Sequence, residues 1–215
     1  MGILLVSLLL EALSSPACPD VQSPAIRAEY EITKHTGRFY EILFKDPVED
    51  LCACFVKDRE VTDVGLTDAD QLFCGMHDAK HFMWVNGTEQ NLFNGSSCDG
   101  GKGGACGNAN FDLVFETPLI KRIHYPNQVI GFGRDAAGAY GGKYVWTVEY
   151  QCMEVLGVRD YLGVNIYHRH WDPPAADLAA IQAVIDAAGL SALWNSTKLK
   201  PISSSPMCNF TANPR

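Results

Sequence analysis

The stretch Gly-Arg-Phe-Tyr-Glu-Ile, residues 37–42, opens the first segment of the chain that has a clear β pattern. Bulky residues alternate between the two faces of this segment: Phe39, Glu41 and Leu43 on one, and Tyr40, Ile42 and Phe44 on the other. Because both sets are large, the pattern predicts a strand over 37–44 that is covered on both sides, and Asp46-Pro47 ends it.

Seven more segments after this one predict strands. They are short, rich in β-branched or aromatic residues, and bounded by Gly, Pro, Asn or Asp. They are Leu51–Val61, Gln71–Met76, His81–Val85, Phe111–Glu116, Gln128–Gly133, Lys143–Cys152 and Tyr161–His168. Eight short strands without intervening helices predict an all-β antiparallel barrel or sandwich, and an eight-stranded barrel encloses at most one small ligand.

One helix is predicted late in the chain, over about 174–188. Pro173-Pro174 marks its start, apolar residues recur at helical spacing from Leu178 to Ile185, and Gly189 closes it. Its apolar face is narrow and suits packing against the outside of a sheet. Residues 18–215 are expected to form a single domain, in which 18–36 is an arm without periodicity.

The N-terminus has the features of an export signal. Residues 3–10 form an apolar run too short to span a bilayer, and small residues lead up to Ala17, so residues 1–17 are predicted to be a signal peptide. Cys18 would then be the first mature residue. An acylated lipoprotein anchor on this cysteine is the alternative, for which Ser15-Pro16-Ala17 is a poor match.

Composition favours the same secretory route. The chain has 8 cysteines, an even number, and four glycosylation sequons, which begin at Asn86, Asn94, Asn195 and Asn209. We therefore expect a secreted, disulfide-bonded glycoprotein without a transmembrane segment. A net charge of -8 argues against nucleic acid and anionic membrane surfaces as partners, and the oligomeric state is left open.

The order of these features resembles the lipocalin family, in which a Gly-x-Trp signature starts the first strand; Phe39 takes the Trp position here. The likeness is greatest to the apolipoprotein D type, and the lipocalin domain of violaxanthin de-epoxidase is a more distant relative. The matching features are Cys18-Pro19 at the start, Tyr150-Gln151-Cys152 late in the seventh strand, Arg169 before Pro173-Pro174, and a terminal Cys208. The second family motif, Thr-Asp-Tyr, is reduced to Gly133-Arg134-Asp135.

The resemblance implies an eight-stranded up-and-down barrel with the helix packed outside. It places Gly37, Phe39 and Arg169 at the barrel floor, with the arginine over the ring in a cation–π contact of roughly 0.5 to 2 kcal/mol. It also implies one disulfide between Cys18 and Cys152 and another between Cys208 and Cys52 or Cys54. The sequence leaves open whether Cys98 and Cys106 pair with each other or either pairs with Cys74.

A small hydrophobic ligand such as a lipid, retinoid, sterol or pigment is the partner that the resemblance implies. Aromatic residues are the candidates to line the cavity, and they are Phe82, Trp84, Phe115, Phe132, Trp146, Tyr150 and Tyr161. The alternative is that they fill a closed core or pack beneath the helix. In that case the protein is a disulfide-rich structural or interaction protein with a filled barrel.

Catalysis is the remaining alternative, as a de-epoxidase or isomerase on an enclosed lipid or carotenoid. It would need a free cysteine inside the barrel, or Glu41 and Glu149 both facing the interior. We expect at least one of these glutamates to face water, and we assign no catalytic residue, cofactor or metal. A metal site needs three or four converging ligands, and His168 and His170 supply only two, so we expect them to be solvated or hydrogen-bonded.

Overall fold

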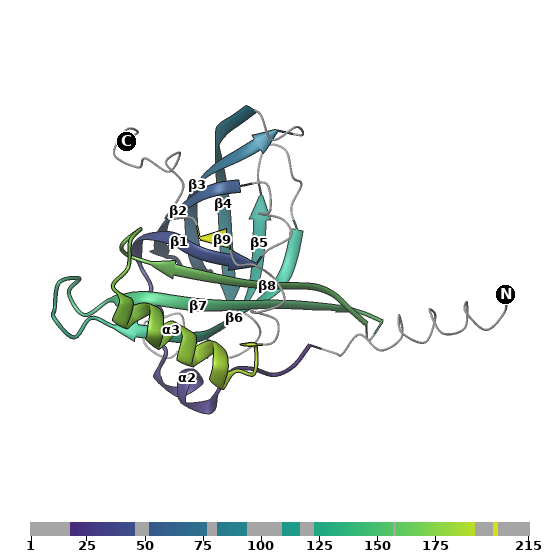
Figure 1. Ribbon diagram of the computed structural model, residues 1–215. Coiled ribbons are helices and arrows are strands. Elements are labelled where there is room, and N and C mark those ends of the chain that lie inside the picture. Colours follow the sequence, from purple (N-terminus) through teal and green to yellow (C-terminus); the bar gives the residue numbers. More distant parts are fainter. Residues whose placement is uncertain are drawn as a thin grey trace.

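The computed structural model describes residues 18–45, 52–76, 81–93, 109–116, 123–156, 158–191 and 200–201. Within them, eight strands form a closed antiparallel barrel (Figure 1). The strands are β1 Gly37–Lys45, β2 Cys52–Val61, β3 Gly65–Met76, β4 His81–Phe93, β5 Asn110–Glu116, β6 Ile123–Arg134, β7 Tyr144–Val155 and β8 Val158–His168. The predicted fold class is confirmed.

Strand β1 closes the barrel because it pairs with two neighbours. Its first half, Gly37–Tyr40, pairs with β2, and its second half pairs with β8. A bulge between Glu41 and Leu43 separates the two parts of the β8 pairing, so the alternation predicted for 37–44 does not continue past Glu41. Leu43 accordingly packs with Ile42 on the outer side. A short strand β9, Lys200–Pro201, adds to β1.

β6 begins at Ile123 rather than Gln128, and two other strands are also much longer than the sequence predicted. β3 begins at Gly65 rather than Gln71, and β4 continues to Phe93 rather than ending at Val85. These two extensions pair with each other along their whole length. Charged or amide side chains recur two apart in them, at Asp68 and Asp70 and at Glu89 and Asn91, and such polar residues are typical of loops in a sequence.

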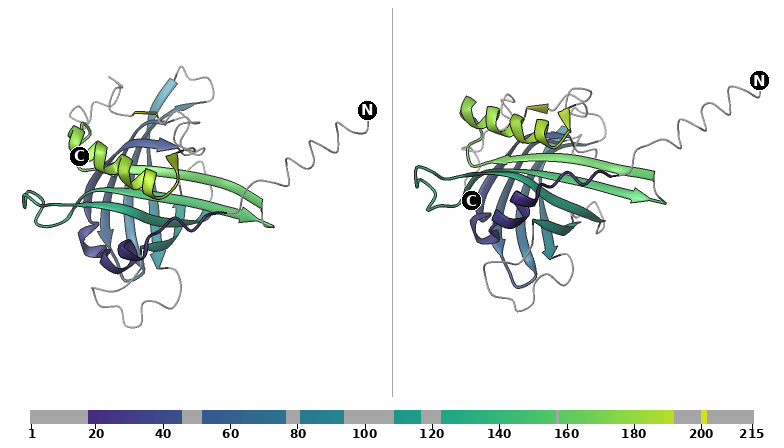
Figure 2. Two further views of the ribbon diagram at one scale, coloured as in Figure 1. Left: turned by 60° about the horizontal axis from the view of Figure 1, so that its bottom comes forward. Right: turned by 90° about the horizontal axis from the view of Figure 1, so that it is seen from below.

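Helix α3, Ala175–Ala187, lies against the outer face of the barrel over β6 and β7 (Figures 1 and 2). Ile181 and Ile185 are its buried residues, and they pack on the outward side chains of the sheet. Gly131 lets the helix approach, because a Cβ at this position would lie 2.6 Å from Val184 Cγ1. At the C-terminal end of the helix, Gly189 adopts a left-handed φ of 69° that ends the helix, as predicted.

The arm before the barrel contains two short helices that the sequence did not predict. They are α2, Pro24–Glu29, and the 3₁₀ turn η1, Ile32–Lys34. Ser23 caps α2 through its side chain, with Pro24 at the first turn, which is a local signal that was available in the sequence. Tyr30 follows α2 and packs into a buried cluster with residues of β3, β5, β6 and β7.

Candidate functional site

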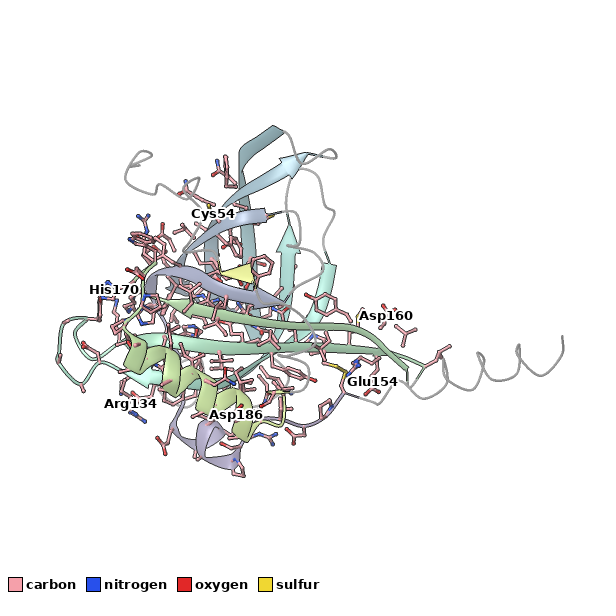
Figure 3. All side chains as sticks on the ribbon, viewed as in Figure 1. Cys54, Arg134, Glu154, Asp160, His170 and Asp186 are labelled. Carbon is pink, nitrogen blue, oxygen red and sulfur yellow. A yellow bond between two sulfur atoms is a disulfide. The ribbon has the colours of Figure 1, made fainter. Side chains whose placement is uncertain are left out.

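The inward face of the barrel is unusually polar. On this face Phe39, Phe55, Leu72, Leu113 and Tyr167 form one apolar cluster. Buried polar residues share the face with it or lie at its base: His35, Glu41, Lys57, Arg59, Asp68, Asp70, Glu89, Asn91, Asn127, Thr147 and Glu149. By contrast, the charged residues Arg134, Asp160 and Asp186 are exposed on the outside (Figure 3). A barrel interior with this many ionisable side chains is the candidate site.

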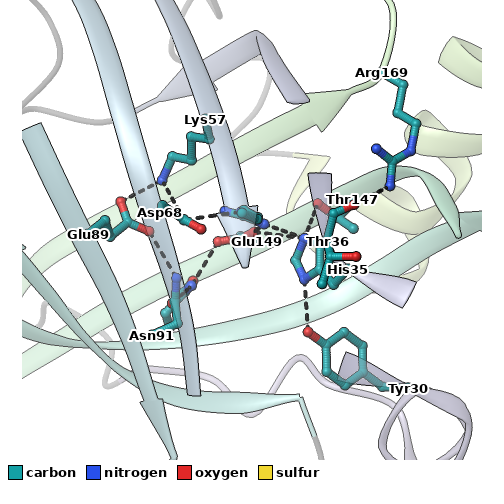
Figure 4. Close-up of polar contacts among 12 residues, drawn as sticks. Tyr30, His35, Thr36, Lys57, Asp68, Glu89, Asn91, Thr147, Glu149 and Arg169 are labelled. Atoms are coloured by element: carbon teal, nitrogen blue, oxygen red, sulfur yellow. Dashed lines mark hydrogen bonds and ion pairs between the residues drawn. The ribbon is translucent and has the colours of Figure 1, made fainter. Parts of the chain in front are cut away.

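Arg59 is the centre of the polar network. Figure 4 shows other members of this network, among them Lys57, Asp68, Glu89, Asn91 and Glu149. The Arg59 guanidinium donates from Nη1 to Glu149 Oε1 at 2.5 Å and from Nε to Asp68 Oδ2 at 3.1 Å. Burial opposes ionisation of Glu149, yet Arg59 and Lys57 outweigh it, so the pKa of Glu149 lies below its ordinary value. Arg59 and Glu149 therefore form a charged pair inside the barrel.

Lys57 forms the second half of the network. Its Nζ donates to Glu89 Oε2 at 2.5 Å and lies 3.8 Å from Asp68 Oδ2. Burial opposes protonation of Lys57, but the neighbouring carboxylates Glu89, Asp70 and Asp68 raise its pKa above the ordinary value. Lys57 therefore remains charged.

Two amides connect the lysine half to the arginine half. Asn91 Nδ2 donates to Glu89 Oε1 at 3.0 Å, and Asn127 Nδ2 donates to Asn91 Oδ1 and to Glu149 Oε2, both at 2.7 Å. The contacts close a ring that runs from β2 through β3, β4, β6 and β7. The ring fixes these side chains relative to one another across the interior.

His35 extends the network to the arm. Its ring contacts Arg59 Nη1, and its Nε2 lies 3.1 Å from Thr147 Oγ1 while its Nδ1 lies 2.8 Å from Tyr30 OH. Because a guanidinium only donates, Nε2 accepts and Nδ1 carries the proton. Burial, with Arg59 close by, holds the pKa of His35 well below its ordinary value. His35 is thus a neutral support for Arg59.

Aromatic faces cover both buried cations. Lys57 Nζ lies 4.9 Å from the ring centroid of Phe55 and 4.7 Å from that of Tyr167. The guanidinium carbon of Arg59 lies 4.7 Å from the Tyr167 centroid. Each buried contact of this kind stabilises a cation by roughly 1 to 2 kcal/mol, so the aromatic residues compensate part of the desolvation.

Asp70 differs from Asp68, Glu89 and Glu149, each of which contacts Lys57 or Arg59. It lies on the inward side of β3, two residues from Asp68 and two from Leu72, and it is 1% exposed. Neither of its carboxylate oxygens has a hydrogen-bond partner in the part of the chain that the structure describes. Burial raises its pKa well above the ordinary value, and it raises that of Asp68 to about 7 despite Arg59 and Lys57.

The barrel floor has the arrangement that the resemblance implies. The guanidinium carbon of Arg169 lies 4.3 Å from the centroid of the Phe39 ring. Arg169 also donates to the carbonyl of Thr36 at 2.8 Å (Figure 4). It donates in addition to the carbonyls of Tyr144 at 2.6 Å and Arg38 at 3.2 Å. A Cβ on Gly37 would meet Arg169 Nη1 at 3.2 Å, so this glycine admits the arginine.

The predicted disulfide between Cys18 and Cys152 is confirmed, with a Cα–Cα distance of 5.7 Å. Cys52 and Cys54 are also disulfide-bonded, so neither is a free thiol. Cys98, Cys106 and Cys208 lie outside the described residues, as does the side chain of Cys74. Of the sequon asparagines, Asn86 is exposed on β4, and Asn94, Asn195 and Asn209 lie outside the described residues.

The aromatic candidates for a cavity fall into separate places. Trp146 and Tyr150 lie beneath α3, in one cluster with Ile181 and Ile185. They therefore follow the alternative of packing under the helix, because the inward positions of β7 carry residues such as Glu149. Phe132 stacks on Tyr144 with ring centroids 4.3 Å apart.

Tyr161 is the remaining aromatic candidate whose side chain is described, and it packs against the interior cluster. Its hydroxyl donates to Gln151 Oε1 at 3.1 Å. The side chains of Phe82, Trp84 and Phe115 lie outside the described part.

The expectation that Glu41 or Glu149 faces water is wrong. Both are 1% exposed, because Glu41 shares the inward face of β1 with Phe39 and Glu149 is held by Arg59.

His168 is buried and hydrogen-bonded to Asp177 at 3.0 Å, and burial lowers its pKa.

Neither a metal site nor a membrane helix is found in the part of the chain described. No three His, Cys, Asp or Glu side chains there are grouped to hold a metal ion. No helix among these residues is both long and apolar enough to cross a membrane.

Most of the charged ring was not predicted from the sequence, because aromatic residues were expected to line the interior. A signal was present, since charged or amide residues recur two apart at Lys57 and Arg59, at Asp68 and Asp70, and at Glu89 and Asn91. Spacing of two on a strand puts both members of a pair on one face.

Comparison with known proteins supports the fold. No family model matches the sequence, and no curated protein matches it significantly. Among solved structures, the chain is similar to apocrustacyanin C2, with a TM-score of 0.54 and 11% identity over 83% of this chain and 86% of that one. It is similar to lobster apocrustacyanin A1, with a TM-score of 0.54 and 10% identity over 82% and 83%. The barrel thus has the lipocalin fold, while the likeness to the apolipoprotein D type stays an expectation.

Proposed function

We propose that this protein is secreted and binds one small, largely hydrophobic molecule inside its barrel, which it carries or sequesters. The observation that carries the proposal is the closed barrel with a fixed polar ring on its inward face. Eight-stranded barrels of this size hold either their own side chains or one small ligand. Ligand sites combine apolar walls with a few precisely held polar groups, and this interior has both.

The apolar cluster and the polar ring would divide the recognition between them. Phe55, Leu72 and Leu113 offer apolar surface beside the ring, and burial of a ligand there is favourable by around 25 cal/mol per Å² before association costs. The ring offers polar groups that fix orientation. Arg169 and Phe39 close the floor, so the ligand would enter at the opposite end. No step in this function requires catalysis.

Secretion is supported by the Cys18–Cys152 disulfide, since such bonds persist in oxidising compartments. Glycosylation, for which Asn86 is exposed, belongs to the same proposal.

Native mass spectrometry of the protein secreted from eukaryotic cells tests the function. We expect a bound species of a few hundred daltons that organic extraction removes, and uptake of one molecule per chain when the extract is returned. Thiol alkylation on the same sample is the control for integrity of the disulfides. If the secreted protein carries nothing and takes up nothing from a broad extract of the same cells, the barrel is filled by its own side chains and the proposal is wrong.

A further inference from the structure

Among the described residues, negative charge is in excess on the inward face. The two buried cations, Lys57 and Arg59, are surrounded by the four carboxyl groups of Asp68, Asp70, Glu89 and Glu149. Glu149 and Glu89 each have a cation at 2.5 Å, which leaves the carboxyl groups on β3 without a full complement of positive charge. Buried charges in proteins are normally paired, so the excess calls for a counter-charge.

The unpaired acceptors lie together on one strand. Asp70 Oδ1, Asp70 Oδ2 and Asp68 Oδ1 are buried and have no hydrogen-bond partner among the described residues. Residues two apart on a strand face the same side about 6.6 Å apart. These three oxygens are therefore close enough to converge on one small donor group.

Among the described residues, the strands beside Asp70 supply no donor to its carboxyl group. Lys57 is opposite Asp70 in the β2–β3 register, but its ammonium is turned to Glu89. Gly87 is opposite Asp70 in the β3–β4 register and has no side chain. The carboxyl group thus lies between two strands that leave its oxygens without donors.

We propose, building on the function proposed above, that the ligand is a small organic amine in its protonated form, whose ammonium group is bound by Asp70 together with Asp68. An ammonium has three N–H donors and no acceptor, which matches three unpartnered acceptor oxygens in number and in charge. The apolar part of the amine would face the cluster that contains Phe55 and Leu72. A metal ion fits less well, since no group of three ligating side chains is present among the described residues.

In the free protein, a proton on Asp70 can neutralise part of the excess negative charge. Burial raises the pKa of Asp70, which favours its neutral form before the ligand arrives. On binding, the ammonium replaces that proton: the Asp70 O–H bond breaks, the proton passes to solvent, and the carboxylate accepts N–H hydrogen bonds from the amine. Lys57, Glu89, Asp68 and Arg59 are the charged groups that act on Asp70 in this exchange.

Calorimetric titration with matched amines and alcohols tests the proposal. The probes are 2-phenylethylamine against 2-phenylethanol, and hexylamine against hexanol. We expect at least one amine to bind one per chain and at least tenfold more tightly than its alcohol. Asp70→Asn should weaken that amine at least tenfold, and Asp160→Asn, which changes an exposed aspartate on β8, should leave it unchanged.

Each other outcome overturns the inference in an identifiable way. Equal affinity for amine and alcohol, or equal weakening by Asp70→Asn and Asp160→Asn, shows that no ammonium site exists at Asp70. A neutral or anionic molecule in the mass spectrum refutes the amine while keeping the ligand-binding function. If neither amine binds and the secreted protein is also empty, both proposals fail. Should Asp70→Asn not fold by near-UV circular dichroism, Asp68→Asn serves as the second variant, with the same tenfold loss expected.

Discussion

Replacement of Arg59 by methionine is the perturbation that best tests the buried network. Methionine keeps most of the length and apolar bulk of the side chain but removes the guanidinium. Glu149 then loses its donor at 2.5 Å and Asp68 loses its donor at 3.1 Å. Both carboxylates stay in the interior, because the strands that carry them cannot turn them toward water.

The expected loss of stability is large. Removing one partner of a buried ion pair costs about 3 to 5 kcal/mol, since an uncompensated charge remains. Arg59 is in contact with two carboxylates and with the face of Tyr167 at 4.7 Å. We therefore expect the loss of stability of Arg59→Met to lie within this range rather than below it. A domain of this size is stable by about 5 to 15 kcal/mol in total. The variant should therefore unfold at a much lower urea concentration.

Urea unfolding with the disulfides intact, followed by tryptophan fluorescence and circular dichroism, measures the effect. Arg38→Met is the matched control: Arg38 also pairs with an aspartate, Asp58, at 2.7 and 2.9 Å, but at the surface. Exposed pairs stabilise by about 0.2 to 1 kcal/mol. We expect Arg38→Met to lose no more than that.

A double-mutant cycle separates the lost pair from lost packing. Glu149→Gln removes the charge that Arg59 pairs with at almost constant shape. The double variant Arg59→Met with Glu149→Gln should be more stable than the sum of the single changes predicts, by about 1 to 3 kcal/mol. Additive effects, or an Arg59→Met loss within 1 kcal/mol of the Arg38→Met loss, would falsify the view that the interior holds a charged network.

Three further predictions concern other parts of the fold. Replacing both Cys18 and Cys152 by serine should lower the free energy of unfolding by about 3 to 5 kcal/mol, because the bond joins residues 134 apart; a loss under 1 kcal/mol in urea would contradict this. Gly131→Ala should cost about 1 to 3 kcal/mol by pushing its Cβ into Val184, and Val184→Ala in the same chain should recover most of it, whereas no recovery would mean that the helix does not pack there. The free energy of unfolding of Asp70→Asn should rise relative to that of the wild type as pH rises from 4 to 8, by up to about 1.4 kcal/mol per pH unit. A difference in urea unfolding that does not change with pH would contradict the raised pKa.

The sign of the pH prediction follows from where the proton is held. Burial raises the pKa of Asp70 in the folded protein, so the folded protein binds a proton that the unfolded chain releases above its ordinary pKa. The stability from this carboxyl group is present in acid and is lost as pH rises through the folded-state pKa. His35 acts in the opposite direction, since its lowered pKa makes acid destabilising below pH 6.5.

The outline of the fold could be predicted from sequence because apolar residues alternate along most of the strands, and this pattern indicates a strand. The first strand, the late helix and the Cys18–Cys152 bond were all predicted in this way or from the family resemblance. β3 and β4 were predicted too short because their inward positions carry Asp68 and Glu89 instead of apolar residues. If polar residues are assumed to face solvent, a strand whose buried face carries charged side chains is not recognised.

The candidate site was hidden for the same reason. Trp146 and Tyr150 looked like cavity residues, but alternation alone does not say which face of a strand is inside a barrel and which is under a helix. That choice is fixed by the partner on each face: α3 covers Trp146 and Tyr150, and Arg59 holds Glu149 on the other side. Both partners are distant in sequence.

The charged interior is better explained by recognition than by stability. Well-packed apolar residues in place of a buried ion pair are often neutral or stabilising by about 1 to 4 kcal/mol, so a barrel selected only for stability gains little from Arg59 and Lys57. The two cations neutralise Glu149 and Glu89 and hold them at fixed positions, and Asp70 is left with acceptors that nothing in the described chain satisfies. A network that compensates its neighbours and leaves the buried Asp70 carboxyl group without a hydrogen-bond partner among the described residues is arranged to receive a cation. The ring of amides and charges keeps that group from relaxing toward a partner of its own.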